Sequence, residues 1–257
     1  MKVVAVFSVK GGVGKTSAAV NLAWSSSREQ RTVLWDLDPQ GGATYLLGLT
    51  PKQKAKADIH ALVKGKTDLV DVVRSTGDGA LDVIPAHDSY SALDLELDAT
   101  KRPERQLDKL LGSLKKHDVA VLDCPPGMSL LSDAILRAAD VVVAPLVPSP
   151  LTMRSLDQVT DMVAGMKKKR PTVVGFLSMV DRRKTIHRDL AQTLPQESEH
   201  VIDVVVPAST TVERMGVERA PIATFAPRSA PTRAYGELWT GVRSALSLPR
   251  PGSGVEA

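Results

Sequence analysis

The chain has 257 residues and a formal net charge of +4, and 43% of its residues are hydrophobic while only 4% are aromatic. Its single cysteine, Cys124, excludes an internal disulfide, and the Cys and His residues lack the spacing of a metal site. No apolar run reaches the roughly 20 residues needed to cross a bilayer, and the apolar start of the chain is too short for a secretory signal. We therefore expect a cytoplasmic protein, and so small a basic excess only weakly favours a nucleic-acid partner.

Short apolar runs rich in Val, Ile and Leu predict buried strands, because none of them alternates strictly between apolar and polar residues. In chain order they are Val3–Phe7, Thr32–Trp35, Leu81–Ile84, Val119–Leu122, Val141–Pro145, Val173–Ser178 and Val201–Val206. Helices are predicted between them at Lys15–Ser26, Glu104–Lys116, Ser129–Ala138, Met153–Lys168 and Ile186–Leu194. The alternation predicts a single-domain α/β fold over residues 1–248, a mostly parallel twisted sheet of about seven to eight strands with helices on both faces. The Pro- and Gly-rich segment 249–257 is expected to be a disordered tail.

A glycine-rich segment, KGGVGKT at 10–16, connects the first predicted strand to the first predicted helix. Glycines let successive backbone N–H groups turn toward phosphate oxygens, and the helix N-terminus adds a positive dipole end. This arrangement predicts a P-loop that binds ATP, although Val9 stands where the strict motif has glycine. Lys15 is expected to hold the β- and γ-phosphates, and the Thr16 hydroxyl to bind Mg²⁺. The other nucleotide-binding positions are predicted to be Gly11, Gly12, Val13, Gly14 and Ser17.

This loop, the segment WDLDPQGGAT (35–44) and the segment VLDCPPG (121–127) together resemble the motifs of the ParA/MinD family of deviant Walker A ATPases. Their order and spacing are most similar to ParA-type partition and positioning ATPases, from Met1 to about Leu246. The resemblance implies an ATP-dependent sandwich homodimer in which Lys10 crosses the interface to the phosphates of the partner subunit. It also implies nonspecific DNA binding on the nucleoid, and hydrolysis stimulated by a ParB-like or cargo-adaptor protein. The cargo would be a chromosome, a plasmid or a protein assembly such as a carboxysome.

Aspartates follow two of the predicted strands, and the carboxyl ends of parallel strands face the ligand crevice of such sheets. Asp36 and Asp38 end the second predicted strand, and Asp123 ends the segment VAVLD. The resemblance implies that Asp38 orients the attacking water near Mg²⁺ and that Asp123 is the Walker B acid. Asp36 is expected to support the magnesium shell. Cys124 is expected to be a buried packing residue rather than a nucleophile.

The resemblance also suggests where the base and the DNA would bind. Family members hold adenine near the stretches that match LSMVDRRK (177–184) and VVPAST (205–210), so Met179 and Pro207 are candidates to flank the base. Ala208 stands where many ParA proteins have arginine, which leaves the base contacts open. Contacts to DNA phosphates, which are independent of sequence and sensitive to salt, are expected from Arg182, Arg183, Lys184 and Arg214. Plain solvated basic residues are the other interpretation of these positions.

Two other functions remain open. A P-loop ATPase or ligase that acts on a small molecule would share the phosphate loop, and ATP-dependent dimerisation would distinguish it. A MinD-like membrane-associated ATPase needs a basic amphipathic C-terminal helix, and the segment PRPGSGVEA does not have that pattern. We therefore expect no membrane partner, and the sequence does not identify the cargo.

Overall fold

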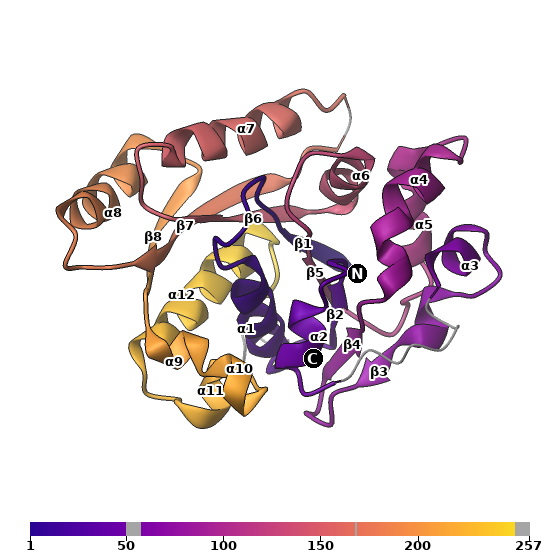
Figure 1. Ribbon diagram of the computed structural model, residues 1–257, viewed down its shortest axis with the longest axis horizontal. Coiled ribbons are helices and arrows are strands. Elements are labelled where there is room, and N and C mark those ends of the chain that lie inside the picture. Colours follow the sequence, from indigo (N-terminus) through magenta and orange to yellow (C-terminus); the bar gives the residue numbers. More distant parts are fainter. Residues whose placement is uncertain (50–57, 168, 250–257) are drawn as a thin grey trace, which may run out of the picture.

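One eight-stranded sheet runs through the computed structural model, which describes residues 1–49, 58–167 and 169–249 (Figure 1). The strands are β1 (Lys2–Val6), β2 (Thr32–Asp36), β3 (Arg74–Ser75), β4 (Leu81–Ile84), β5 (Val119–Asp123), β6 (Val141–Leu146), β7 (Thr172–Val180) and β8 (Val201–Pro207). Their order in the sheet is β3-β4-β2-β5-β1-β6-β7-β8, and all neighbouring pairs are parallel except β3 with β4. The predicted fold class is confirmed, and the one unpredicted strand is the two-residue β3.

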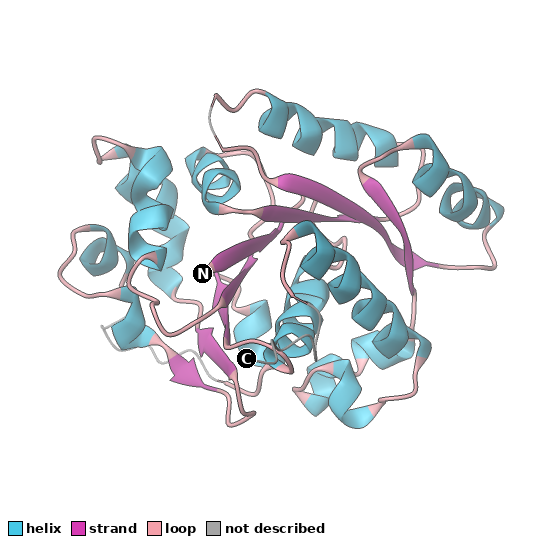
Figure 2. Ribbon diagram, turned by 180° about the vertical axis from the view of Figure 1, so that it is seen from behind, coloured by secondary structure: helices cyan, strands magenta, loops and turns pink. Residues whose placement is uncertain are grey.

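The helices of the described residues cover both faces of the sheet (Figures 1 and 2). They are α1 (Lys15–Ser27), α2 (Gly42–Leu46), α3 (Ile59–Val63), α4 (Leu93–Asp98), α5 (Gln106–Leu111), α6 (Leu130–Ala138), α7 (Thr152–Ala164), α8 (Thr185–Glu197), α9 (Thr210–Glu213), α10 (Met215–Glu218), α11 (Ile222–Phe225) and α12 (Ala230–Ala245). Short 3₁₀ turns lie at Leu69–Val72, Asp88–Ala92 and Pro103–Arg105. None of these helices is both long enough and apolar enough to cross a membrane.

Each strand contributes to two apolar cores because successive side chains point to opposite faces. Val3, Ala5 and Phe7 pack with residues of α3 to α8, whereas Val4 and Val6 pack with residues of α1 and α10 to α12. Burial on both faces explains why the strands are continuous apolar runs without alternation.

The helix predictions are only partly confirmed. The predicted helix Glu104–Lys116 was too long, because α5 ends at Leu111 before Gly112. No helix was predicted over α12, although this is a 16-residue helix. Gly236 and Gly241 lower its helix propensity, but a Cβ on Gly241 would lie 2.8 Å from Cδ1 of Ile202 in β8. The close packing of α12 on the sheet therefore requires a residue that weakens the helix signal in the sequence. The predicted tail lies outside the described residues after Pro249.

Candidate functional site

The loop between β1 and α1 has a backbone that only glycine adopts without strain at two positions. Gly12 and Gly14 have φ angles of 69° and 90°. A Cβ on Gly14 would also lie 2.8 Å from the Ser178 hydroxyl oxygen in β7. Gly14 is the N-cap of the 13-residue helix α1. The loop thus presents a helix N-terminus without a side-chain cap, which is the type of site that binds phosphate.

The two lysines of the loop lie in different surroundings. Lys15 is 7% exposed, and its Nζ donates a hydrogen bond to the Lys10 carbonyl oxygen at 3.0 Å. Burial lowers the pKa of Lys15, and this shift is opposed by the nearby Asp123, Cys124 and Asp38. The Nζ of Lys10 instead donates to the Leu151 carbonyl oxygen at 3.4 Å. Lys15 lines the main cavity of this edge, whereas Lys10 lines a separate hollow of about 40 Å³.

Two fully buried carboxylates end the neighbouring strands β2 and β5. Asp36 Oδ2 accepts hydrogen bonds from the Thr44 amide and hydroxyl, each at 2.7 Å, but Asp36 Oδ1 and both carboxylate oxygens of Asp123 have no hydrogen-bond partner. Burial raises the pKa of Asp36 to about 6, partly offset by the Thr44 bonds. Burial and the neighbouring Asp36 raise the pKa of Asp123 well above its usual range. Thr16 and Lys15 lie close enough to oppose that second shift in part.

Asp38 lies at the mouth of the same edge, on the turn that follows β2. Its Oδ1 accepts a hydrogen bond from the Gln40 amide at 2.9 Å, and its carbonyl oxygen accepts one from Gly41. This turn leads into α2, and a Cβ on Gly42 would lie 3.1 Å from Thr16 Cγ2. Asp38 therefore has a turn-forming role and also lines the cavity beside the glycine loop.

The side-chain oxygens at this edge of the sheet are suited to a hard cation that is coordinated by both the protein and a phosphate. Orphaned buried oxygens of Asp36 and Asp123, the Thr16 hydroxyl and Asp38 are the oxygen ligands that Mg²⁺ prefers. Within residues 1–49, 58–167 and 169–249, no group of three or more His, Cys, Asp or Glu side chains is arranged to hold a metal on its own. Mg²⁺ commonly binds through one or two carboxylates plus substrate phosphates, so these observations agree.

A cavity of about 540 Å³ extends from the glycine loop to the start of the helices after β8. It brings together most of the predicted nucleotide-binding residues: Gly11, Gly12, Gly14, Lys15, Thr16, Ser17, Asp38, Met179 and Pro207. Val13 does not line it, since its side chain is 7% exposed and borders the smaller hollow beside Lys10. The phosphate end of this cavity is polar, and its far end has mainly apolar walls.

Met179 has a strained backbone at the far end of the cavity. Its φ angle is 56°, in the left-handed region that a residue with a Cβ rarely adopts. It lies where the pairing of β7 with β8 changes register between Leu177 and Val180. Such bulges redirect a side chain at the end of a strand, and strain of this kind clusters at ligand sites.

Several residues of the site were not found by sequence reasoning, because they come from segments without a motif. Tyr235 of α12 and Met215 and Gly216 of α10 line the cavity. Arg219 connects the two ends of the site: its Nη2 donates to the Leu49 carbonyl oxygen at 3.0 Å, and its guanidinium lies 4.7 Å from the ring centre of Tyr45 in α2. The helix that follows Asp38 is thereby attached to the segment that borders the far end of the cavity.

The four candidate DNA-binding residues are exposed and lie outside the cavity. Arg183 forms an ion pair with Asp181 at 2.9 Å, which lowers the pKa of Asp181. Arg214 pairs with Glu218 at 2.6 Å. Arg182 and Lys184, between β7 and α8, take part in no ion pair among the described residues, so their charges are available to an outside anion.

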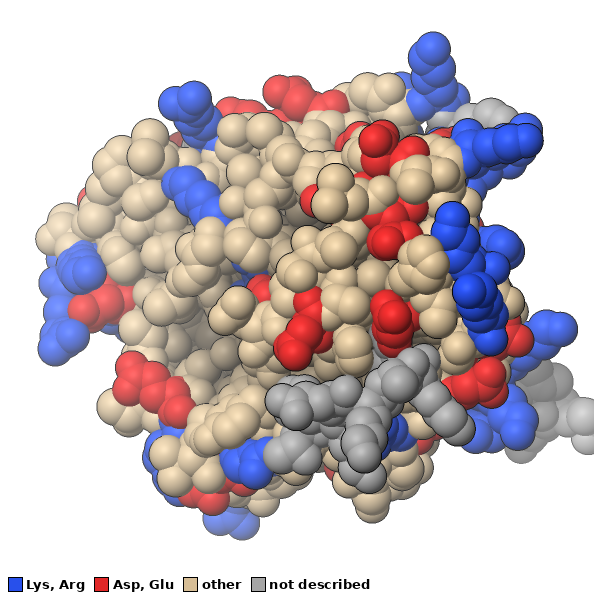
Figure 3. Space-filling model, turned by 45° about the vertical axis from the view of Figure 1, so that its right-hand side comes forward, with Lys and Arg blue, Asp and Glu red and all other residues tan. Residues whose placement is uncertain are grey.

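The face that carries α3, α4 and α5 is different in charge. Acidic side chains gather toward its centre, and basic side chains lie mainly toward its edges (Figure 3). Asp94 and Asp98 of α4 are among its exposed acids. A phosphate backbone would be repelled there, so this face is a poor match for DNA.

Known proteins resemble this chain in both sequence and fold. A family model described as an AAA domain matches residues 1–174. The chain is 30% identical over 244 residues to the sporulation initiation inhibitor protein Soj of Bacillus subtilis, with 92% of this chain and 96% of Soj covered. It is 29% identical to the chromosome partitioning protein ParA of Caulobacter vibrioides, with 93% and 92% covered. The fold is similar to that of Cyanothece McdA in a complex with ATP, with a TM-score of 0.80, 20% identity, and 97% and 98% of the two chains covered.

Proposed function

Since the chain belongs to the ParA family of P-loop ATPases, we propose that it is a positioning ATPase that dimerises around ATP, binds DNA without sequence preference and is released by hydrolysis. The observation that carries the proposal is a glycine loop with two lysines of unequal placement. Lys15 faces the cavity, while Lys10 does not. Two buried carboxylates beside this loop, Asp36 and Asp123, have oxygens without a hydrogen-bond partner.

The nucleotide step rests on charge placement rather than covalent chemistry. Lys15 and the backbone amides of Gly11 to Thr16 bind the phosphates. Thr16, Asp38 and Asp123 would hold Mg²⁺ together with the phosphates, and Asp36 would support them. When bound, the cation neutralises the charge that develops on the phosphate oxygens. Asp38 accepts a hydrogen bond from the attacking water and orients it toward the γ-phosphate.

Dimerisation would complete the site through Lys10. Among the described residues, its ammonium donates one long hydrogen bond, to the Leu151 carbonyl oxygen at 3.4 Å. Release of so weak a contact leaves Lys10 free to reach the phosphates of a second copy of the chain. Hydrolysis would then depend on the dimer, and a ParB-like or cargo-adaptor protein would accelerate it.

DNA would provide the surface on which the ATP-bound dimer is retained, which would place the protein on the nucleoid in the cytoplasm. Arg182 and Lys184 are the best placed of the four candidates, because neither is neutralised by a carboxylate among the described residues. Arg183 and Arg214 would have to exchange their carboxylate partners for phosphate.

The test is binding to nonspecific duplex DNA with ATP, with ADP and without nucleotide, at two salt concentrations. We expect salt-sensitive binding with ATP alone. Replacement of Arg182 and Lys184 by Ala should reduce the slope of log affinity against log salt by about two for each subunit that contacts DNA, and thus by about four for a dimer bound through both subunits, since each phosphate contact contributes about one. The matched control replaces Lys101 and Arg102, two exposed basic residues that follow α4.

Absence of DNA binding in every nucleotide state would refute the DNA part of the proposal. If the protein then also stays monomeric with ATP, an ATPase that acts on a small molecule becomes the better assignment. An equal loss in the control variant would show that general charge, not the turn before α8, determines binding.

A further inference from the structure

The far end of the cavity contains a buried phenol that the phosphate chemistry does not use. Tyr235 lies on α12, is 3% exposed and lines the cavity together with Met179 and Pro207. Among the described residues its hydroxyl forms no hydrogen bond, and it is not one of the fully enclosed polar atoms without a partner, so it is open to the cavity. A polar group that faces a cavity without a protein partner is available to a ligand that enters the cavity.

We propose that the Tyr235 hydroxyl donates a hydrogen bond to the base of the bound nucleotide, an inference that rests on the proposed ATP binding. The walls around it are suited to a planar ring, since Met179, Pro207, Val212 and Met215 present apolar side chains to the same space. The ring would lie among these apolar groups, and Tyr235 would supply a hydrogen bond at its edge.

The other polar side chains of this part of the cavity differ from Tyr235 in position or in partner. Ser178 is also buried and forms no side-chain hydrogen bond among the described residues, but it lies against Gly14 at the glycine loop, where a Cβ would lie 2.8 Å from its hydroxyl oxygen. The Ser209 hydroxyl accepts a hydrogen bond from the Thr211 amide at 3.1 Å and caps α9. Glu213 is exposed and lies at the outer rim. Tyr235 is therefore the buried polar side chain left at the base end.

The chemistry of the phenol sets the class of ligand. Burial raises the pKa of Tyr235 far above the physiological range, so the hydroxyl remains protonated and can donate. Both adenine and guanine present ring nitrogens that accept a hydrogen bond, such as N7. Tyr235 should therefore strengthen the binding of purine nucleotides over bare phosphate, without by itself distinguishing ATP from GTP.

The chain offers a matched control on the other face of the sheet. Tyr90 is also 3% exposed, but its hydroxyl accepts a hydrogen bond from Nε1 of Trp35 at 3.3 Å. Tyr90 does not line the cavity. Tyr90→Phe thus removes a hydroxyl that has a hydrogen bond in the protein without ligand. Tyr235→Phe removes a hydroxyl that would form its hydrogen bond only when nucleotide binds.

The experiment measures the affinity of wild-type protein, Tyr235→Phe and Tyr90→Phe for Mg–ATP and for inorganic tripolyphosphate by calorimetry, with thermal unfolding of each protein without ligand. Tyr235→Phe should bind ATP roughly three- to tenfold more weakly, as expected for one neutral hydrogen bond. Its tripolyphosphate affinity should be unchanged, and its unfolding midpoint should not fall. Tyr90→Phe should show the opposite pattern, with normal ATP affinity and an unfolding midpoint lower by about 2–4 °C.

Two outcomes would overturn the role of Tyr235 alone: an unchanged ATP affinity in Tyr235→Phe, or an equal loss of affinity for ATP and tripolyphosphate. Failure of the wild-type protein to bind ATP would instead overturn the proposed function, and the role of Tyr235 with it. The two failures are distinguished by the wild-type titration.

Discussion

The two edges of the sheet use the same residue type for opposite purposes. At the carboxyl edge, Asp36 and Asp123 end strands, are fully buried and leave carboxylate oxygens without partners. At the amino edge, Asp118 and Asp140 directly precede strands, and each has a carboxylate oxygen that accepts a backbone hydrogen bond. Asp118 Oδ2 accepts from the Arg31 amide at 3.0 Å, and Asp140 Oδ2 accepts from the Val3 amide at 2.8 Å.

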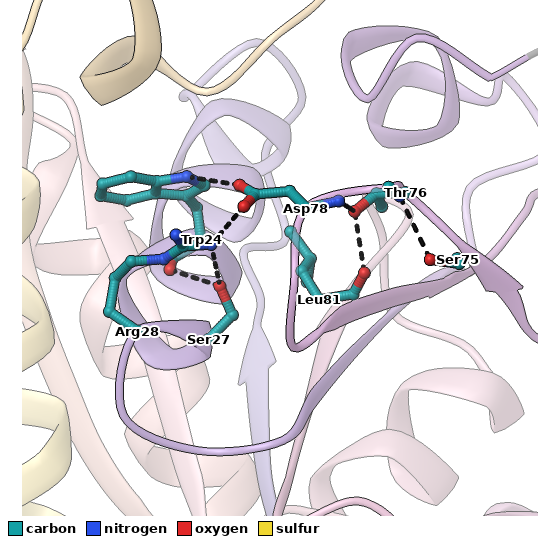
Figure 4. A network of polar contacts seen from close by, with 8 residues as sticks. Trp24, Ser27, Arg28, Ser75, Thr76, Asp78 and Leu81 are labelled. Carbon is teal, nitrogen blue, oxygen red and sulfur yellow. Dashed lines mark hydrogen bonds and ion pairs between the residues drawn. The ribbon is translucent and has the colours of Figure 1, made fainter.

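The amino edge also contains a polar network that joins α1 to the turn between β3 and β4 (Figure 4). Asp78 accepts from Trp24 Nε1 at 3.0 Å and from Arg28 Nη2 at 2.7 Å. The Asp78 amide donates to the Thr76 hydroxyl, which in turn donates to the Leu81 carbonyl oxygen at 2.8 Å. This network fixes the end of α1 that lies farthest from the glycine loop.

The role of an aspartate at the end of a strand therefore depends on whether it precedes or follows the strand. Before a strand, the carboxylate meets free backbone amides and lysine or arginine side chains, so it is satisfied by the fold itself. After a strand, it meets the N-terminus of α1 and the ligand crevice, so it is left for a cation or phosphate. The carboxyl edge therefore leaves carboxylate oxygens of Asp36 and Asp123 without partners, whereas Asp118 and Asp140 at the amino edge each accept a backbone hydrogen bond.

The largest effect should come from the lysine that faces the unsatisfied carboxylates. Lys15→Ala should weaken ATP binding by a factor on the order of 10³, because a buried charge is lost from the phosphates. Lys10→Ala should bind ATP nearly as well as wild type, since Lys10 does not line the cavity. Calorimetric titration measures both, and retained ATP affinity in Lys15→Ala would refute the assignment of the loop.

Next in size is the loss of hydrolysis in Asp38→Ala, by about 10²-fold or more, because the group that accepts a hydrogen bond from the attacking water is removed. ATP binding should persist, and phosphate release measures the rate. Asp38→Asn is the control for the turn, because its side-chain oxygen can still accept from the Gln40 amide. A wild-type rate in Asp38→Ala would remove its role in hydrolysis, whereas a normal rate in Asp38→Asn would show that an acceptor oxygen is sufficient and that the negative charge is not needed.

A smaller effect concerns stability against pH without nucleotide. The pKa of Asp36 is raised to about 6 in the folded protein, against about 3.9 in an unfolded chain. The contribution of Asp36 to stability is therefore full below about pH 4 and is lost as the pH rises through about 6. Asp36→Asn should flatten the stability curve in this window and raise the free energy of unfolding at pH 7 by about 2 kcal/mol.

Denaturant unfolding across pH 4–7 measures this change, with Asp98→Asn, on the exposed face of α4, as the control. A curve for Asp36→Asn that parallels the wild-type curve would show that Asp36 is not the group responsible. It would also weaken the contrast between the two edges.

The smallest effect is expected at the amino edge. Asp78→Ala should lower the free energy of unfolding by about 1 kcal/mol, because the Arg28–Asp78 pair is 42% exposed on both sides and is screened by water. ATP affinity should not change. Thermal unfolding and an ATP titration check this prediction, and a loss of ATP affinity would show that the far end of α1 is coupled to the site.

Local signals in the sequence were sufficient for the elements that carry motifs. The buried runs of Val, Leu and Ile predicted all strands except β3, because burial on both faces removes polar residues from them. The glycine loop and the aspartates at strand ends predicted the phosphate end of the cavity. The backbone conformation and the charges that this end requires come from short stretches of sequence. The helix α12 was not predicted because Gly241 lowers its helix propensity. Glycine is needed at this position for close packing against Ile202 of β8.

The α/β class, the phosphate loop and the family could be predicted from the sequence, because they depend on short runs and motifs whose residues lie close together along the chain. The sequence did not show which carboxylates are satisfied, that Lys10 and Lys15 line different hollows, or that Tyr235 borders the cavity of Lys15. Burial and the absence of a hydrogen-bond partner are properties of packing between distant segments. Lys15 and Tyr235 are 220 positions apart in the sequence. They border the same cavity because α1 and α12 pack side by side on one face of the sheet.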